Sequence, residues 1–409
     1  MELKKIHISD IGKVVTGKTP RTSVAENYGG DIPFLTPSDN LSHKSAPKTI
    51  KTLTKQGLNE VKNCLLPPQS VCVSCIGSDL GKVVMTVEPT VTNQQFNSIV
   101  PNENFNADFV YYLMSQVGKE LNYLSKTSTA VPIINKSSFS NYEVEVPSLK
   151  VQEKIASILA SLDSKIELNR RINDNLEQQA QTLFKSWLVD FDPFKNGKFV
   201  ESEMGMIPEG WKVISLQEYC QEITRGNIPT YVEKSNRPIL NQKVNKGVSL
   251  EKQYYKYNSE NVEVSISKMA HYGDVLLNSL GQGTLGRVHL YKEKLGNVII
   301  DQFITILRTN LFVKSAYLSY TLNRPEYQTI IEGNVTGSTG MWVLTINNVR
   351  NIKIIVPKES CFLELAPIIN SIYQAISNNT AEMEQLCTLR DCILPHLMSG
   401  ELKINDLNC

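Results

Sequence analysis

Apolar residues follow two different periods along the chain. Before Pro147, and again before Pro357, short runs rich in Val, Ile and Leu are broken by Gly, Pro, Asn and Ser, which is typical of strands joined by turns. The runs that predict strands are Ser70–Ile76, Lys82–Val87, Val144–Val146, Val262–Ile266, Asp274–Leu277, Arg287–Tyr291 and Ile352–Val356. Phe109–Leu124 and Ala316–Glu332 have helical spacing instead and predict one helix in each part.

After Pro147 the helical period takes over. From Ile155 to Trp187 the apolar residues recur at three- and four-residue steps, and no Gly or Pro interrupts them before Pro193. Leu149–Leu188 therefore predicts a single helix about 60 Å long, at 1.5 Å per residue.

A second long helix is predicted after Pro357. Apolar residues from Leu365 to Ile393 repeat the helical spacing. We expect Pro367 to weaken the start of this helix, and Pro395 and Gly400 to end it, because proline removes a backbone donor and glycine favours the end of a helix.

A helix of this length with one apolar stripe is not stable alone in water. The two long helices are natural partners, and Asn169 and Asn379 occupy equivalent positions where a buried polar residue can set the register. Antiparallel pairing would relate the two halves of the chain by a pseudo-twofold axis. The alternative is that each helix packs only on its own domain.

The two halves are repeats of one another. Pro147 and Pro357 lie 210 residues apart (357 − 147), as do Ser128 and Ser338 (338 − 128). The matching pieces occur in the same order in both halves, which indicates a tandem duplication of one domain type. The predicted fold is therefore α+β, with two similar α/β domains (1–147 and 193–357) separated by long antiparallel coiled-coil helices (148–192 and 358–409).

Composition adds little to this picture. Hydrophobic residues make up 41% and charged residues 20% of 409, which is ordinary for a globular protein. A net charge of +1 means that attraction to an anionic polymer must come from local patches. No apolar run is long enough to span a membrane, so we expect no membrane partner and a cytoplasmic protein. Eight scattered cysteines fit a reducing compartment.

Two motifs suggest chemistry that their context does not support. Cys72 and Cys75 have no second Cys or His pair to complete a zinc site, so we interpret them as buried free thiols. Gly281, Gly283 and Gly286 match a dinucleotide-binding pattern, but an alternating, strand-like run follows them where a helix is required. We found no phosphate loop, catalytic triad or metalloprotease motif, so the sequence predicts binding without catalysis and no cofactor.

Polar loops at matching places in both halves combine small residues with a basic one. Lys and Arg neutralise phosphates, while Ser, Thr, Asn and Gln offer hydrogen bonds to base edges. For any single residue, an ordinary solvated turn remains the alternative. The candidate DNA-binding residues are Lys18, Thr19, Arg21, Ser78, Lys82, Lys126, Ser128, Thr129, Asn135, Lys136, Arg225, Asn227, Gln282, Thr284, Arg287, Ser338, Thr339, Trp342 and Asn347.

The equivalent loops differ in chemistry between the halves. Asp79 corresponds to Thr284, and Ala130-Val131 corresponds to Gly340-Met341. Two related domains that differ in these loops would bind different sequences, so we expect recognition of a bipartite, asymmetric site in double-stranded DNA.

Several stretches resemble the DNA-specificity (S) subunit of type I restriction–modification enzymes. They include Val146–Leu159, Leu162–Arg170, Leu183–Pro193, Ile207–Trp211 and Leu394–Glu401, and with the repeat they cover nearly the whole chain. The resemblance implies two target-recognition domains, each reading half of a split sequence, joined by helical spacers. It also implies that the chain catalyses nothing itself.

The resemblance further implies protein partners. Two modification subunits that methylate adenine N6 with S-adenosylmethionine would dock on the chain, and restriction subunits would add DNA translocation and cleavage. The candidate docking residues are Phe184, Trp187, Leu188 and Phe191, and for each of them packing in a core is the alternative. Two alternatives remain from the residues alone: a scaffold or clamp that joins proteins without reading DNA, and an enzyme with an unrecognised active site.

Overall fold

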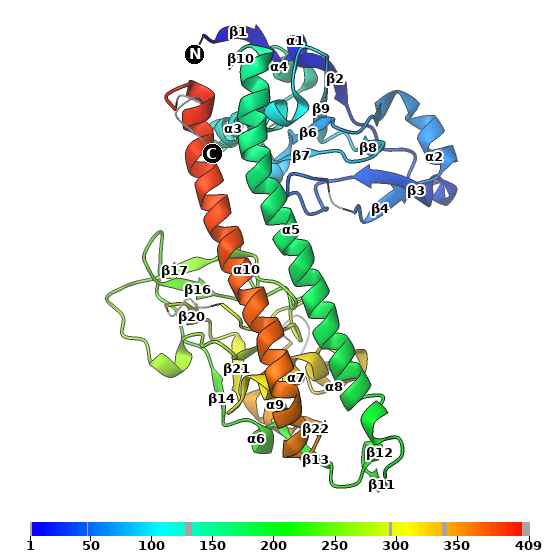
Figure 1. The fold of residues 1–409 in the computed structure, drawn as a ribbon, viewed down its shortest axis with the longest axis vertical. Coiled ribbons are helices and arrows are strands. Elements are labelled where there is room, and N and C mark those ends of the chain that lie inside the picture. Colours follow the sequence, from blue (N-terminus) through cyan, green and yellow to red (C-terminus); the bar gives the residue numbers. More distant parts are fainter. Residues whose placement is uncertain (1, 47, 127–132, 294–296, 338–341, 403–409) are drawn as a thin grey trace. The chain divides into compact units, whose positions relative to one another are not determined.

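The computed structural model describes residues 2–46, 48–126, 133–293, 297–337 and 342–402. The chain forms two compact units: the described residues of Met1–Leu168 and Glu382–Cys409, and those of Asn169–Ala381. The long helices α5 (Leu149–Leu188) and α10 (Glu359–Ser399) contribute residues to both units (Figure 1).

The first unit contains two four-stranded sheets and a two-stranded ribbon. Its strands are β1 (Lys4–His7), β2 (Gly12–Thr16), β3 (Tyr28–Leu35), β4 (Lys51–Leu53), β5 (Leu65–Leu66), β6 (Val71–Ser74), β7 (Val83–Met85), β8 (Thr90–Thr92), β9 (Phe96–Pro101) and β10 (Glu143–Val146). Its other helices are α1 (Ile8–Ile11), α2 (Lys55–Glu60), α3 (Ala107–Lys126) and α4 (Lys136–Ser140). The sheets have the orders β2-β9-β6-β7 and β4-β3-β8-β5, and β1 pairs with β10.

The second unit repeats this plan. Its strands are β11 (Phe199–Ser202), β12 (Gly205–Pro208), β13 (Lys212–Ser215), β14 (Glu222–Arg225), β15 (Tyr231–Val232), β16 (Pro238–Leu240), β17 (Lys256–Asn258), β18 (Val275–Asn278), β19 (Val288–Leu290), β20 (Ile299–Ile300), β21 (Ile304–Arg308) and β22 (Lys353–Val356). Its other helices are α6 (Leu216–Tyr219), α7 (Phe312–Leu322), α8 (Pro325–Gly333) and α9 (Ile346–Asn351). The sheets have the orders β14-β21-β18-β19 and β15-β17-β16-β20, and β13 pairs with β22.

The two units share an unusual topological detail. Each has one parallel strand pair, β3 with β8 and β16 with β20, among otherwise antiparallel pairs of the described strands. In both units a glycine directly after a strand, β2 in the first and β14 in the second, lies against the backbone that follows this parallel pair. A Cβ on Gly17 would lie 2.1 Å from the Asn93 carbonyl oxygen, and one on Gly226 would lie 2.2 Å from that of Asp301. The same close approach at equivalent places supports a common ancestry of the two folds.

The sheets bury their apolar side chains against one long helix in the first unit and two shorter ones in the second. In the first unit, Val71 and Val73 of β6 lie in one buried cluster with Phe109 and Met114 of α3. In the second, the predicted helix 316–332 is wrong as a single element, because Pro325 begins a new helix and holds the preceding Arg324 in an extended conformation.

One predicted strand does not form. Val262–Ile266 lies outside the strands of the second unit, although Val264 is buried with Ile239 and Ile299. The neighbouring edge strand β20 has only two residues, and Met269 already makes an isolated bridge to Ile299. An alternating pattern gives a strand only where a partner edge is available.

Within each unit, part of α5 runs antiparallel to part of α10. In the first unit Asp163 bonds to Arg390 and Lys165 pairs with Glu382. Their order reverses along the two helices, which defines the antiparallel direction.

The same direction holds in the second unit, where the Asn379 side-chain amide donates to Asn173 Oδ1 at 2.9 Å and the Tyr373 hydroxyl donates to Glu177. Asn169, predicted as a register residue, is buried.

The expectation that Pro395 ends the second long helix is wrong. α10 continues through Pro395 to Ser399. Leu394 and Leu397 are buried in the core of the first unit, at 3% and 0% exposure. Burial of these two side chains offsets the loss of one backbone hydrogen bond at the proline.

We predict that Gly226→Ala destabilises the second unit. The added methyl group would overlap two backbone carbonyls, which costs about 1–3 kcal/mol when the surroundings must move. Gly333→Ala is the matched control in the same unit, because a Cβ there meets nothing within 4 Å. Thermal unfolding of both variants measures the difference, and equal midpoints would contradict the prediction.

Candidate nucleic-acid interface

Loops that are distant in sequence meet at one edge of the first unit. The loop after β2 is held by backbone bonds from Gly17 N to Phe96 O at 3.1 Å and from Lys18 N to Thr92 O at 2.9 Å. The Thr19 hydroxyl donates to Gln94 Oε1 at 2.6 Å. The predicted loop of Lys18 and Thr19 thus packs on the segment between β8 and β9.

The segment just before α4 joins the same edge. Ile134 N donates to Cys75 O at 3.0 Å, and Asn97 Nδ2 donates to Ile134 O at 3.1 Å. Thr16 Oγ1 in turn donates to Asn97 Oδ1 at 2.7 Å. Side chains and backbone therefore connect the end of β2, the β6–β7 hairpin and the entry to α4.

Two predicted basic residues of the first unit are already paired. Arg21 makes three hydrogen bonds to Glu60, of which the Nη2–Oε1 contact is 2.7 Å. These bonds hold the pKa of Glu60 at about 2. Lys82 Nζ lies 2.6 Å from Asp79 Oδ1. Lys18 and Lys136 are exposed and can approach a polyanion more readily.

The remaining candidates of the first unit fall into two groups. Asn135 caps α4, because its Oδ1 accepts a bond from Ser138 N at 2.8 Å, so a structural role accounts for this residue. The side chains of Ser78 and Lys126, and all of Ser128 and Thr129, lie outside the described part of the structure.

The second unit brings together the equivalent loops. Gly226 N donates to Ile304 O at 3.1 Å and Asn227 N donates to Ile300 O at 2.7 Å. Leu344 N donates to Ser279 O at 2.9 Å, as Ile134 N does to Cys75 O. The carbonyls of these two equivalent residues accept side-chain bonds: Ile134 O accepts one from Asn97, and Leu344 O accepts one from Arg225.

Several polar candidates of the second unit brace the backbone. Arg225 bonds the Leu344 carbonyl, and burial lowers its pKa. Arg287 donates to Gly283 O at 3.0 Å and to Asn245 O at 3.3 Å. The Thr284 hydroxyl donates to Gly281 O at 3.3 Å. These three side chains shape the loops, and their capacity for contacting DNA is reduced.

Other candidates in this unit face solvent. Gln282 and Asn347 are exposed, and Trp342 is 50% exposed, an unusual position for a large aromatic side chain. Ser338 and Thr339 lie outside the residues that the structure describes.

The glycine-rich motif forms a hairpin. Gly281, Gly283 and Gly286 lie between β18 and β19 and have φ values of +107°, +74° and +85°. Because a strand follows them, they create no helix N-terminus for a pyrophosphate, as the sequence predicts. The Gln328 side chain of α8 donates to Gly286 O at 3.1 Å and fixes this turn.

Cys72 and Cys75 are buried at 0% and 2% exposure and are free thiols. Burial raises the pKa of Cys72 to about 12. Among the described residues, no group of three His, Cys, Asp or Glu side chains is placed to hold a metal ion. No helix of the described part is long and apolar enough to cross a bilayer.

The sequence analysis did not include the loop after β16 among the candidate DNA-binding loops. The Asn278 side chain donates to Gln242 O at 3.1 Å, which ties this loop to the β18–β19 hairpin, and Lys243 beside it is exposed. The signal available was a polar run directly after the apolar pair Ile239-Leu240.

The sequence pattern also did not single out Tyr231 as a candidate binding residue. Its ring is 48% exposed, its hydroxyl donates to Asp301, and Lys256 Nζ lies 4.4 Å from the ring centroid.

The candidate docking residues pack inside their own unit. Phe184 and Leu188 are buried at 1% and 2% exposure in one cluster with Tyr317 and Leu318, so they present no surface to a partner. Trp187 and Phe191 are partly buried against this cluster, and the ring centroids of Phe191 and Trp211 lie 5.2 Å apart. The core of the second unit therefore accounts for most of this apolar surface.

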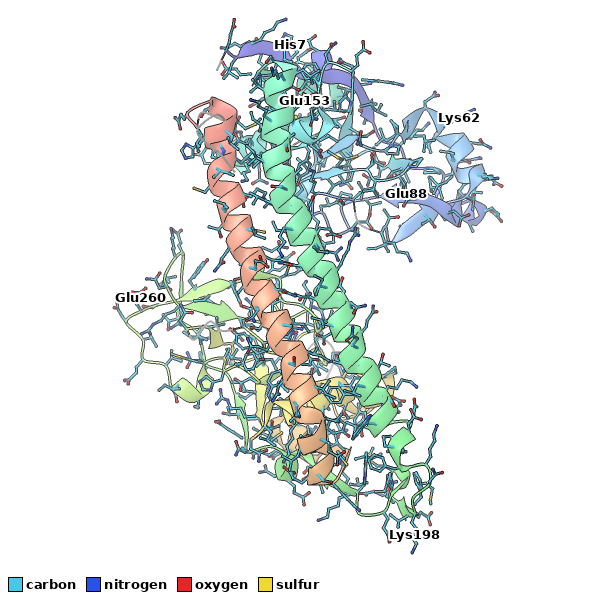
Figure 2. The ribbon with its side chains drawn as sticks, viewed as in Figure 1. His7, Lys62, Glu88, Glu153, Lys198 and Glu260 are labelled. Carbon is cyan, nitrogen blue, oxygen red and sulfur yellow. The ribbon has the colours of Figure 1, made fainter. Side chains whose placement is uncertain are left out.

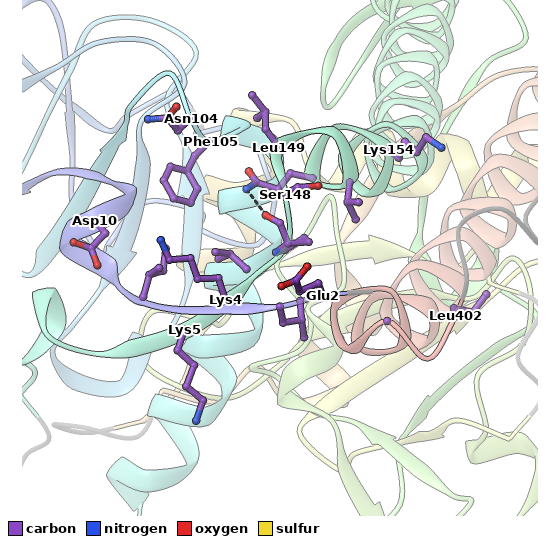
Figure 3. Close-up of a pocket in the computed structure, with 17 residues that line it drawn as sticks. Glu2, Lys4, Lys5, Asp10, Asn104, Phe105, Ser148, Leu149, Lys154 and Leu402 are labelled. Atoms are coloured by element: carbon purple, nitrogen blue, oxygen red, sulfur yellow. Dashed lines mark hydrogen bonds between the residues drawn. The ribbon is translucent and has the colours of Figure 1, made fainter.

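A separate open depression lies at the start of the first unit. Figure 3 shows Lys4 and Glu2 beside Ser148, Leu149 and Leu402 around it. The loops of the candidate interface do not line this depression, and no predicted site residue falls in it.

The model of the type I restriction modification DNA specificity domain matches residues 1–178. Over 421 aligned positions the chain is 28% identical to the type I restriction enzyme MjaIX specificity subunit of Methanocaldococcus jannaschii, covering 99% of this chain and 94% of that protein. It is 36% identical over 174 residues to the type I restriction enzyme HindI specificity subunit of Haemophilus influenzae, covering 41% and 38% respectively.

A solved structure has the same fold. The S subunit of a type I restriction–modification system from M. genitalium aligns with a TM-score of 0.50 at 15% sequence identity, covering 97% of this chain and 96% of that one. The predicted fold class is therefore confirmed. Residues 1–178 match the model of the type I restriction modification DNA specificity domain, and the chain is similar over nearly its whole length to a type I restriction enzyme specificity subunit, in line with the sequence resemblance.

We predict that Glu60→Gln strengthens DNA binding by releasing Arg21. One more available guanidinium should steepen the slope of log affinity against log salt by about 0.9. Glu26→Gln removes the same charge from an exposed position in this unit and serves as the control. A salt titration of duplex binding measures both variants, and identical slopes would contradict the role assigned to Arg21.

We predict that the stabilising effect of the Arg21–Glu60 pair depends on pH. Because the pKa of Glu60 is depressed in the folded state, its stabilising effect is present above the ordinary value of 4.5 and is lost as pH falls towards 2. An NMR titration of the Glu60 carboxylate in wild type and Arg21→Ala measures this. The midpoint should rise towards 4.5 in the variant.

Proposed function

We propose that this chain is the sequence-specific DNA-recognition subunit of a type I restriction–modification complex. Each of its two α/β domains reads one half of a bipartite site. The observation that carries the proposal is the pair of equivalent loop clusters, built on the same backbone hydrogen bonds and lined by different side chains. Similarity to specificity subunits over nearly the whole chain supports it.

The reading residues are those that the fold leaves available. In the first domain these are Lys18 and Lys136, and in the second they are Gln282, Trp342 and Asn347. Lysines fix the register on phosphates, and amide side chains pair with base edges. We add Lys243, which lies in the loop after β16 that Asn278 ties to the β18–β19 hairpin.

The candidates outside the described residues remain predictions: Lys126 and Ser78 for their side chains, and Ser128, Thr129, Ser338 and Thr339 as a whole. The recognition domains remain assigned to 1–147 and 193–357, with the helical segments 148–192 and 358–409 beside them.

The helices would set the spacing between half-sites and dock two modification subunits. Paired α-helices are stiff, which suits a spacer whose length is to be read in base pairs. In this proposal the chain catalyses nothing and binds no cofactor. The modification subunits supply adenine-N6 methylation with S-adenosylmethionine, restriction subunits complete the complex, and the assembly works in the cytoplasm.

We predict that the complex of this chain with its modification subunits selects a split motif from random duplexes. Exchanging residues 1–147 for those of a relative should change one half of that motif and leave the other unchanged. Sequencing of methylated duplexes measures both halves. Changes in both halves would contradict modular reading. Selection of no motif by the wild-type complex would favour a scaffold that joins proteins, and methyl transfer by the chain alone would reverse its assignment as non-catalytic.

A further inference from the structure

A carboxylate of α5 connects three elements of the first unit. Asp163 Oδ2 accepts a hydrogen bond from the Tyr112 hydroxyl of α3 at 2.5 Å, and Oδ1 accepts one from Arg390 Nη1 of α10 at 2.7 Å. The Asp163 side chain is 11% exposed. Charge-assisted hydrogen bonds shielded from water are strong and directional, so this carboxylate fixes the angles between its partners.

Lys44 extends the cluster to the loop between β3 and β4. Its ammonium lies 2.7 Å from Asp108 Oδ1 and donates to the Tyr112 hydroxyl at 3.2 Å. The backbone of the same loop is paired with β7, because Met85 N donates to Lys44 O at 2.7 Å. The cluster therefore reaches from the helices to the sheets that carry the candidate reading loops.

The second unit has a cluster of the same design with different residues. Glu177 of α5 accepts a bond from the Tyr373 hydroxyl of α10 at 3.0 Å, and its Oε2 lies 2.9 Å from Lys292 Nζ, just after β19. Burial, and then the nearby Glu177 charge, raise the pKa of Tyr373 well above its usual value. The hydroxyl therefore keeps its proton and remains a donor at neutral pH.

Apolar packing alone does not explain these clusters. Ile155 and Leu159 of α5 already anchor the helix in the core of the first unit. Burial of apolar area is non-directional and tolerates small rotations of one element on another. The pair of Arg170 with Asp174 differs from these clusters, because it is exposed and joins two residues of the same helix.

We propose that Asp163 and Glu177 are positioning residues, each fixing the orientation of one α/β domain on the helices of its own unit. This orientation decides the angle at which the reading loops meet a duplex, and with it the half-site spacing that is accepted. Only this second consequence rests on the proposed function.

The first test needs no DNA. Spin labels on unnatural amino acids at Lys62 and Glu153, both exposed and labelled in Figure 2, report the distance between the sheets and α5 within the first unit. Wild type should give one narrow distance. Asp163→Asn should broaden the distance distribution, because losing one charge-assisted hydrogen bond raises the population of other domain orientations by about tenfold.

Two controls accompany this variant. Asp174→Asn removes a carboxylate of α5 that is 61% exposed and should leave the distance unchanged. Glu177→Gln should also leave it unchanged, because its partners lie in the second unit. If Asp163→Asn does not fold cooperatively, Tyr112→Phe replaces it, since that change removes one hydroxyl and keeps the ring in the core.

The second test measures methylation of split sites whose spacers are one base pair longer or shorter. Asp163→Asn and Glu177→Gln should each lower the preference for the correct spacer by about tenfold and leave the bases read unchanged. Distances in Asp163→Asn equal to those in Asp174→Asn would overturn the proposal. Broadened distances in a chain whose wild type selects no split motif would support the positioning role and refute the proposed function.

Discussion

The apolar stripe of α5 is the constraint on which both units depend. Forty residues with one apolar face need a cover along their whole length, and no small domain supplies it alone. In the first unit, Ile155 and Leu159 share a core with Leu394 and Leu397 of α10. In the second, Phe184 shares one with residues of the early part of α10. Neither unit is therefore complete without a segment far away in the sequence.

This requirement separates two kinds of surface. The side chains that face the helices are committed to core packing, as Phe184 and Leu188 show. The loops at the edge of each sheet are not needed for core packing, because hydrogen bonds hold their shape, such as the backbone bonds of Gly17 and Gly226 and the side-chain bonds of Asn97 and Arg225. Loops with this freedom can change chemistry without changing the fold. The bond to one equivalent carbonyl illustrates this, since Asn97 makes it in one unit and Arg225 in the other.

The sequence predicts the elements better than the roles of single residues. The bounds of α5 follow from the three- and four-residue apolar spacing, and the hairpin at Gly281 follows from the strand pattern after it. The break at Pro325 was missed because the apolar spacing continues across it. The extension of α10 past Pro395 could not be predicted, since it depends on burial of Leu397 in a core from the other end of the chain.

Candidate binding residues were harder still. Arg21, Arg225 and Arg287 look alike in the sequence, and only tertiary contacts show that Glu60 or backbone carbonyls occupy them. Lys243 gave no motif, and its place beside the β18–β19 hairpin depends on one long-range bond from Asn278. Periodicity reports burial, whereas the partner of a charged side chain depends on which loops the fold brings together.

The central claim is that one chain binds DNA at two separate places, through two related domains. Hydroxyl-radical footprinting of the complex of this chain with its modification subunits tests it most directly. The account predicts two protected patches on the duplex with an accessible stretch between them, and loss of one patch when the loops of one domain are replaced. A single patch, or two patches that disappear together, would contradict it.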